Sequence, residues 1–101
     1  MSARRRRRVF YTRAAERDLV GIAAYTRRTW GEEQAERYLT VLEHTCERIL
    51  PEHHRLAREI EERPGIFRWR VERHVVFLRK VDDGIEIIRI LHERMLPARH
   101  L

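Results

Sequence analysis

The side chains most capable of chemistry in this sequence are basic residues and histidines in its second half. Arg70 and His92, with a carboxylate such as Glu43 or Glu47, could form an acid–base set for RNA cleavage. In such a set the histidine moves a proton and the arginine holds the phosphate. The same basic residues could instead pair with acidic groups of a partner protein. We favour this second interpretation, in which Arg68 and Arg70 belong to a basic sheet face.

Other reactive centres have little support in the sequence. None of the 6 histidines has metal-ligand spacing to Cys46 or to an acidic residue. Ser2 is the only serine, and the 4 glycines are scattered rather than gathered in a phosphate-binding loop. Cys46 falls on the apolar stripe of a predicted helix and is interpreted as a small core residue. We therefore expect neither a metal nor a cofactor.

Composition limits the chain to one small domain. Its 101 residues are 43% hydrophobic and 38% charged, which suits a folded domain rather than a disordered chain. No run approaches the roughly 20 apolar residues of a membrane helix, and no apolar segment of a secretory signal follows the basic residues. The single cysteine excludes an internal disulfide, so a reducing cytoplasm is the expected location.

Much of the net charge of +6 comes from 5 consecutive arginines at residues 4–8. Basic arms of this kind bind nucleic acids or acidic proteins with little selectivity. We interpret residues 1–8 as a disordered basic arm and residues 9–101 as the folded domain. No sequence-specific DNA binding is expected.

Two helices are predicted in the first half. A short apolar run at residues 9–11 is a candidate strand, and Thr12 can cap the helix that follows. Apolar residues at helical spacing predict helices before Gly31 and between Glu32 and Pro51, joined as an antiparallel hairpin. The residues expected in the core between the helices and a sheet are Leu19, Ile22, Trp30, Tyr38, Leu39 and Leu42.

The apolar period then changes from 3.6 to 2, which indicates strands. Residues 52–65 are predicted to be a connecting loop with at most one helical turn. Strands are predicted from residue 67 to 71, from 75 to 78 and from 85 to 91, with a hairpin turn at residues 82–84. The fold class is α+β, in the order β-α-α-β-β-β, with a helical hairpin packed on a mostly antiparallel sheet. One sheet face is expected to stay bare until a partner covers it.

Four blocks of residues resemble the ParE branch of the RelE/ParE superfamily of toxins from type II toxin–antitoxin modules. The resemblance covers residues 9–101. The first two blocks contain Tyr11-Thr12, Ala15, Asp18-Leu19, Ile22 and Tyr25, and then Trp30-Gly31, Gln34-Ala35, Tyr38 and Leu42. The last two contain Gly65, Arg68, Arg70 and His74, and then Ile85, Ile87, Arg89-Ile90-Leu91-His92, Arg94-Met95 and His100-Leu101.

This resemblance implies a cytoplasmic toxin that binds DNA gyrase and traps cleaved DNA, and that is neutralised by a cognate antitoxin. It implies a binding protein rather than a hydrolytic enzyme. The residues expected to contact the target are Arg89, His92, Arg94 and Met95. The residues expected to contact the antitoxin or to surround that contact are Phe67, Arg68, Trp69 and Arg70.

The alternative within the superfamily is a RelE-like endoribonuclease that cuts mRNA on the ribosome. The tyrosines all lie in the first half and Lys80 is the only lysine, so a Lys/Arg/Tyr catalytic set near the C-terminal end is missing. A Glu/Arg/His set stays open, because Arg70 and His92 could fill two of its roles. The Arg4–Arg8 arm and Leu78, where many relatives have tyrosine, depart from the family pattern.

Overall fold

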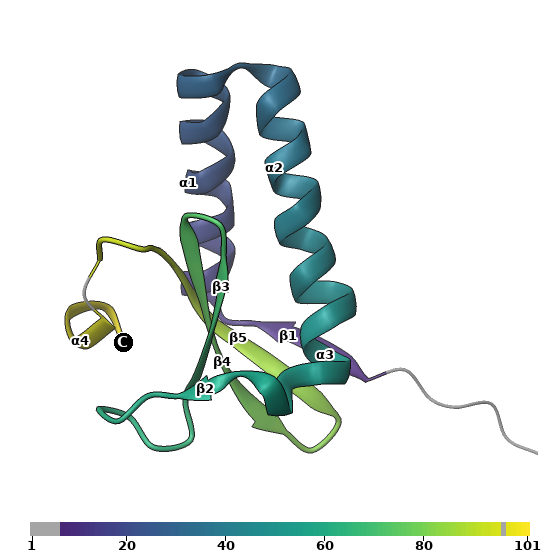
Figure 1. Cartoon of the computed structure of the whole chain (residues 1–101), viewed down its shortest axis with the longest axis vertical. Coiled ribbons are helices and arrows are strands. Elements are labelled where there is room, and N and C mark those ends of the chain that lie inside the picture. The colour runs from purple at the N-terminus through teal and green to yellow at the C-terminus, as the bar shows by residue number, and fades with distance from the viewer. Residues whose placement is uncertain (1–6, 96) are drawn as a thin grey trace, which may run out of the picture.

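The structure, a computed structural model, describes residues 7–95 and 97–101, and it shows a helical hairpin beside a twisted sheet (Figure 1). The first strand, β1 (Arg8–Tyr11), leads into α1 (Arg13–Trp30) and α2 (Glu32–His44). A π-helical turn (Thr45–Ile49) joins α2 to α3 (Leu50–His53), which a 3-10 turn (His54–Leu56) follows. The later elements are β2 (Arg58–Glu59), β3 (Phe67–Val71), β4 (His74–Val81), β5 (Gly84–His92) and α4 (Pro97–His100).

The ends of α1 confirm both sequence signals. The Thr12 side chain accepts a hydrogen bond of 3.0 Å from the backbone N–H of Ala15, which satisfies a donor that the first turn leaves free. Gly31 ends the helix at a φ of 91°, a conformation that glycine adopts without steric cost. These two residues therefore set the length of the first helix.

Pro51 does not end the second helical segment, contrary to the sequence prediction. The helix continues through the π-helical turn and past Pro51 to His53. A proline ring normally clashes with the carbonyl of the preceding helical turn. A widened turn moves that carbonyl away, and the backbone N–H of Leu50 bonds to the Thr45 carbonyl across it.

The sheet contains five strands in the order β1-β5-β4-β3-β2. β1 lies parallel to β5, and the other neighbouring strands are antiparallel, which confirms the mostly antiparallel sheet. At Gly84, a Cβ atom would come within 1.9 Å of the Arg8 carbonyl oxygen, so only glycine permits this close approach of β1. Arg8 therefore belongs to β1, whereas residues 1–6 of the expected arm lie outside the described residues.

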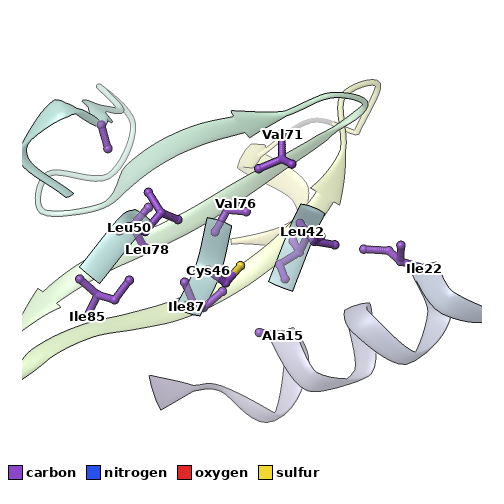
Figure 2. Close-up of a cluster of buried hydrophobic side chains, with 12 residues drawn as sticks. Ala15, Ile22, Leu42, Cys46, Leu50, Val71, Val76, Leu78, Ile85 and Ile87 are labelled. Atoms are coloured by element: carbon purple, nitrogen blue, oxygen red, sulfur yellow. The ribbon is translucent and has the colours of Figure 1, made fainter. Parts of the chain in front are cut away.

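The main core lies between the helices and one face of the sheet (Figure 2). Ile22 and Leu42 are buried, as the sequence predicts, while Leu19, Tyr38 and Leu39 are partly buried against the same cluster. Trp30 was expected in the core and is 52% exposed. It stands at the far end of α1, where the hairpin extends beyond the strands (Figure 1).

The opposite face of the sheet is not bare, which corrects the sequence prediction. Phe77 and Leu91 point to this face and are only 2% and 1% exposed. They form a second buried cluster with Ile60, against which Ile66 and Leu101 pack. The loop around β2 and the chain after β5 therefore cover this part of the sheet with the protein's own residues. The two-residue strand β2 was itself unexpected within the predicted loop.

Candidate functional site

A cleft of about 280 Å³ opens where the helical hairpin passes the end of the sheet. Aromatic and polar residues from both helices line one side, and the β3–β4 turn with the facing ends of β4 and β5 lines the other. The lining residues are Tyr25, Thr26, Trp30, Gln34, Arg37, Tyr38, Glu72, Arg73, His74 and His92. Six of them belong to the blocks that carry the family resemblance: Tyr25, Trp30, Gln34, Tyr38, His74 and His92. Segments far apart in sequence thus meet at one place.

A tyrosine and two histidines form the inner wall of this cleft. His74 begins β4 and lies directly opposite His92 at the end of β5. Their rings meet edge to face, with centroids 5.5 Å apart. Tyr38 approaches from α2, and its hydroxyl lies 2.6 Å from Nδ1 of His74 and 3.4 Å from the Val71 carbonyl. The three side chains therefore connect α2 to the sheet.

Burial keeps Tyr38 and His74 uncharged at neutral pH. It lowers the pKa of His74 to about 4, and the nearby His92 acts in the same direction. Burial also raises the pKa of Tyr38 above its ordinary value. A general acid or base works best with a pKa near the operating pH. The Tyr38–His74 pair therefore suits binding and orientation better than proton transfer.

The β3–β4 turn holds the rim of the cleft against the helices. The Arg73 guanidinium lies 5.6 Å from the centroid of the Trp30 ring, a cation–π contact between the turn and the tip of α1. Glu72, in the same turn, has a φ of 52°, which is unfavourable for a residue with a Cβ atom. Such strain concentrates at functional sites, where surrounding contacts maintain it.

The residues expected to contact the target occupy different environments. Arg94 and Met95 are exposed after the end of β5, and His92 faces the cleft. Arg89 instead points toward α1, where Nε and Nη2 donate bonds of 2.8 and 2.9 Å to the Asp18 carboxylate. That carboxylate also accepts a bond of 2.9 Å from the Ile90 N–H. Hydrogen bonding to Asp18 raises the pKa of Arg89, so the guanidinium stays charged.

The residues expected to contact the antitoxin divide between the two faces of β3. Phe67 and Trp69 turn toward the helices and pack against the main core. Arg68 and Arg70 project from the opposite face, where Arg70 forms an ion pair with Glu93. The four residues share one strand but not one surface.

The proposed acid–base set does not assemble. Arg70 pairs with Val75 on the face away from the helices, whereas His92 pairs with His74 on the helical side. Glu47 accepts a hydrogen bond from Tyr11, at β1. Glu43 and Glu47 line a separate hollow of about 600 Å³ between β1 and α2. The geometry therefore gives no support to Arg70 and His92 as partners in catalysis.

Residues 7–95 and 97–101 contain no cluster of metal-ligand side chains and no membrane-spanning helix. No three His, Cys, Asp or Glu side chains among them gather closely enough to hold a metal ion. Burial raises the pKa of the Cys46 thiol to about 12, so that cysteine stays protonated and packs as a core residue. No helix in these ranges has the length and apolar character needed to cross a membrane.

The helical spacing of apolar residues predicts Tyr38 and Trp30 in the core and does not indicate the cleft. The helical stripe correctly placed both on the inner side of the hairpin, but it could not show where the sheet stops. One usable signal was the short interval between the predicted strands at residues 67–71 and 75–78. It requires a tight turn and places His74 at the start of a strand.

The chain matches known proteins over most of its length. The model of the family described as "ParE toxin of type II toxin-antitoxin system, parDE" matches residues 9–97. Toxin ParE1 of Caulobacter vibrioides is 41% identical over 91 residues, which cover 89% of this chain and 93% of that protein. Toxin ParE of Escherichia coli is 39% identical over 85 residues, which cover 83% and 82%.

A further relative and a solved structure agree with these matches. Toxin ParE1 of Mycobacterium tuberculosis H37Rv is 37% identical over 90 residues, which cover 87% of this chain and 91% of that protein. A chain of the chromosomal ParDE toxin–antitoxin system from P. aeruginosa has the same fold, with a TM-score of 0.68 at 21% identity over 86% of this chain and 96% of that one. The protein therefore belongs to the ParE family of toxins from type II toxin–antitoxin systems.

Proposed function

We propose that this ParE-family toxin acts in the cytoplasm by binding DNA gyrase, and that a cognate antitoxin neutralises it by covering its surface. Membership of the ParE branch supports the choice of gyrase. The observation that favours binding over cleavage is the separation of Arg70 and His92 on opposite faces of the sheet. Because Arg70 and His92 are not brought together in the described part of the chain, action through contacts with the target is the better supported mode.

We place the target contact at the exposed residues Arg94 and Met95. Met95 is 38% exposed, and an unbranched thioether adapts readily to a partner surface. Asp18 and Arg89 act as positioning residues, because they hold the end of β5 against α1. His92 lies between this end and the cleft, so the target surface continues into the cleft wall.

A supercoiling assay with purified toxin and gyrase tests this proposal. Loss of supercoiling with accumulation of cleaved DNA is the expected result. Arg94→Ala and Met95→Ala should each weaken inhibition by about tenfold, the effect of losing roughly 1.4 kcal/mol of contact energy. Leu56→Ala changes a side chain that is 74% exposed next to β2, and it serves as the matched control with unchanged inhibition.

The same preparation tests the ribonuclease alternative on translating ribosomes. Intact mRNA together with inhibited gyrase supports the proposal. Codon-specific mRNA cuts with fully active gyrase would contradict it and would assign the chain to a RelE-like activity.

A further inference from the structure

Two arginines face each other directly across the short pairing of β2 with β3. Arg58 is the register partner of Arg68, and both side chains are exposed. Residues directly opposite on antiparallel strands have Cβ atoms about 5 Å apart, so like charges there repel and destabilise the pairing. β2 has only 2 residues, which leaves little pairing to offset this repulsion.

Three other arginines of the sheet strands already have carboxylate partners. Arg70 pairs with Glu93, Arg79 with Glu86 and Arg89 with Asp18. Arg58 and Arg68 form no ion pair with any carboxylate in residues 7–95 or 97–101. They are thus an uncompensated pair of charges in a face where neighbouring arginines have partners.

Glu59, the acidic residue next to Arg58 in the sequence, binds elsewhere. Glu59 follows Arg58 but lies opposite Phe67, and its carboxylate accepts a bond of 2.8 Å from the Gly65 N–H. Glu59 therefore holds the loop before β3 and does not neutralise the arginines. The exposed Glu61 and Glu62 belong to that same loop and form no ion pair with either arginine.

We propose that Arg58 and Arg68 form a carboxylate-binding site for an acidic segment of the antitoxin. This inference rests on the proposed neutralisation by an antitoxin and adds the chemistry of the contact. Two adjacent guanidinium groups can each offer a planar fork of N–H donors to a carboxylate. Binding of a carboxylate neutralises the repulsion between the two arginines. Relief of this repulsion, which is present in the free toxin, adds to the affinity for the partner.

The surroundings favour an acidic protein segment over a nucleic acid. Binding to a phosphate backbone usually depends on several unpaired basic residues in a row. Here Glu86 and Glu93 already occupy Arg79 and Arg70, and they would repel further phosphates. Within the part of the chain that the structure describes, the backbone of β3 beyond Arg68 has no partner strand on the β2 side, because β2 pairs only with Phe67 and Arg68. A peptide segment could use that open edge, whereas a nucleic acid could not.

The test uses the isotope-labelled full chain and a synthetic oligoglutamate peptide as the probe, at low ionic strength. The Nε–H signals of Arg58 and Arg68 should shift on titration. Arg58→Gln and Arg68→Gln should each weaken binding by about fivefold or more. Both variants should also raise the melting temperature of the free chain, because the repulsion is removed. Arg79→Gln is the matched control on the same face and should do neither.

In the Arg58 and Arg68 variants, peptide binding should weaken while the melting temperature rises. This combination distinguishes a binding site from a merely structural role. An equal loss of binding in Arg79→Gln, or lower melting temperatures in the Arg58 and Arg68 variants, would overturn the proposal. Tighter binding of an oligothymidylate of equal charge, with the same dependence on both arginines, would assign the site to nucleic acid instead. Neither gyrase nor supercoiling enters this measurement, so its failure is separate from failure of the proposed target.

Discussion

Arg89 joins three segments of the chain through one guanidinium group. It binds the Asp18 carboxylate of α1 through two nitrogens, and Nη1 donates a bond of 2.9 Å to the His100 carbonyl. The side chains of Arg89 and Asp18 are only 22% and 13% exposed, so water screens the attraction between the two charges weakly. A charge pair at this depth is costly to break, because the remaining partner stays charged without compensation.

Asp18→Ala should therefore lower the free energy of unfolding by about 2–4 kcal/mol, as measured by urea denaturation. It removes both bonds to Arg89 and the bond to the Ile90 N–H. Glu86→Ala breaks an exposed pair with Arg79 and is the control, with a cost below about 1 kcal/mol. Equal effects in the two variants would show that Asp18 has no special role.

His74 should make stability depend on pH in a defined window. Burial lowers its pKa from 6.5 to about 4 in the folded chain, so the unfolded chain binds the proton more readily. The free energy of unfolding should therefore fall as the pH drops from about 6.5 through about 4, and this contribution is absent above that window. Urea midpoints of the wild type and His74→Gln should differ by an amount that changes only within the window. A constant difference between the two would contradict the assignment.

At the scale of elements, α2 contacts the sheet with an inner row of apolar side chains and a less buried row beside it. Leu42 is fully buried and lies among the core side chains drawn in Figure 2, whereas Leu39 is partly buried and packs against this cluster. The π-helical turn follows α2 directly and contributes the buried Cys46. The inner row thus continues from α2 across the turn to Leu50.

Leu42→Ala should lower the free energy of unfolding by about 2–5 kcal/mol, because it leaves a cavity in a closely packed core. Leu39→Ala should cost about 1–2 kcal/mol, because its side chain already contacts water. Chemical denaturation of both variants measures the difference. A larger loss for Leu39 would mean that α2 is rotated relative to the arrangement described above.

The sequence allowed prediction of the elements that local patterns determine. Thr12 and Gly31 define α1 through capping and backbone conformation, and the alternation from Phe67 to Val71 matches β3 residue for residue. The two-residue β2 exists only through its pairing with β3, so no periodic pattern could show it. The prediction that Pro51 ends the second helix was wrong for a related reason. The spacing of apolar residues does not indicate the π-helical turn that accommodates the proline.

The candidate site was harder to predict because distant segments build it. Tyr38 and His74 both belong to the sequence blocks that carry the family resemblance, but their contact depends on how the hairpin lies across the sheet. No sequence pattern singles out Arg58, because only strand register places it opposite Arg68. The chemical types of these residues are thus evident from the sequence, whereas the contacts between them depend on the tertiary structure.

At the scale of the whole molecule, the chain after β5 turns back over the sheet. Leu101 packs against the second cluster, and Arg63 donates a bond of 2.5 Å to its carbonyl oxygen. Together with the bond from Arg89 to His100, this contact holds α4 beside the sheet. The face that was expected to await a partner is therefore partly occupied by the chain itself.

Leu101→Asp should expose this second cluster and lower the free energy of unfolding by about 1–2 kcal/mol. Binding of a hydrophobic dye should increase at the same time, because Phe77 and Leu91 become accessible. Leu56→Asp introduces the same charge at a side chain that is 74% exposed and should change neither signal. Unchanged dye binding in Leu101→Asp would show that the contact does not protect the cluster.

The parallel pairing of β1 with β5 makes the order of synthesis matter. The register joins Arg8 to Gly84 and Tyr11 to Ile87, so the strand made first has no hydrogen-bonding neighbour until the strand made last exists. Closing so long a loop is a slow step compared with forming the helical hairpin. β1 of a nascent chain therefore acquires its hydrogen-bonding neighbour only after β5 has been synthesised, so the sheet is completed later than the helical hairpin.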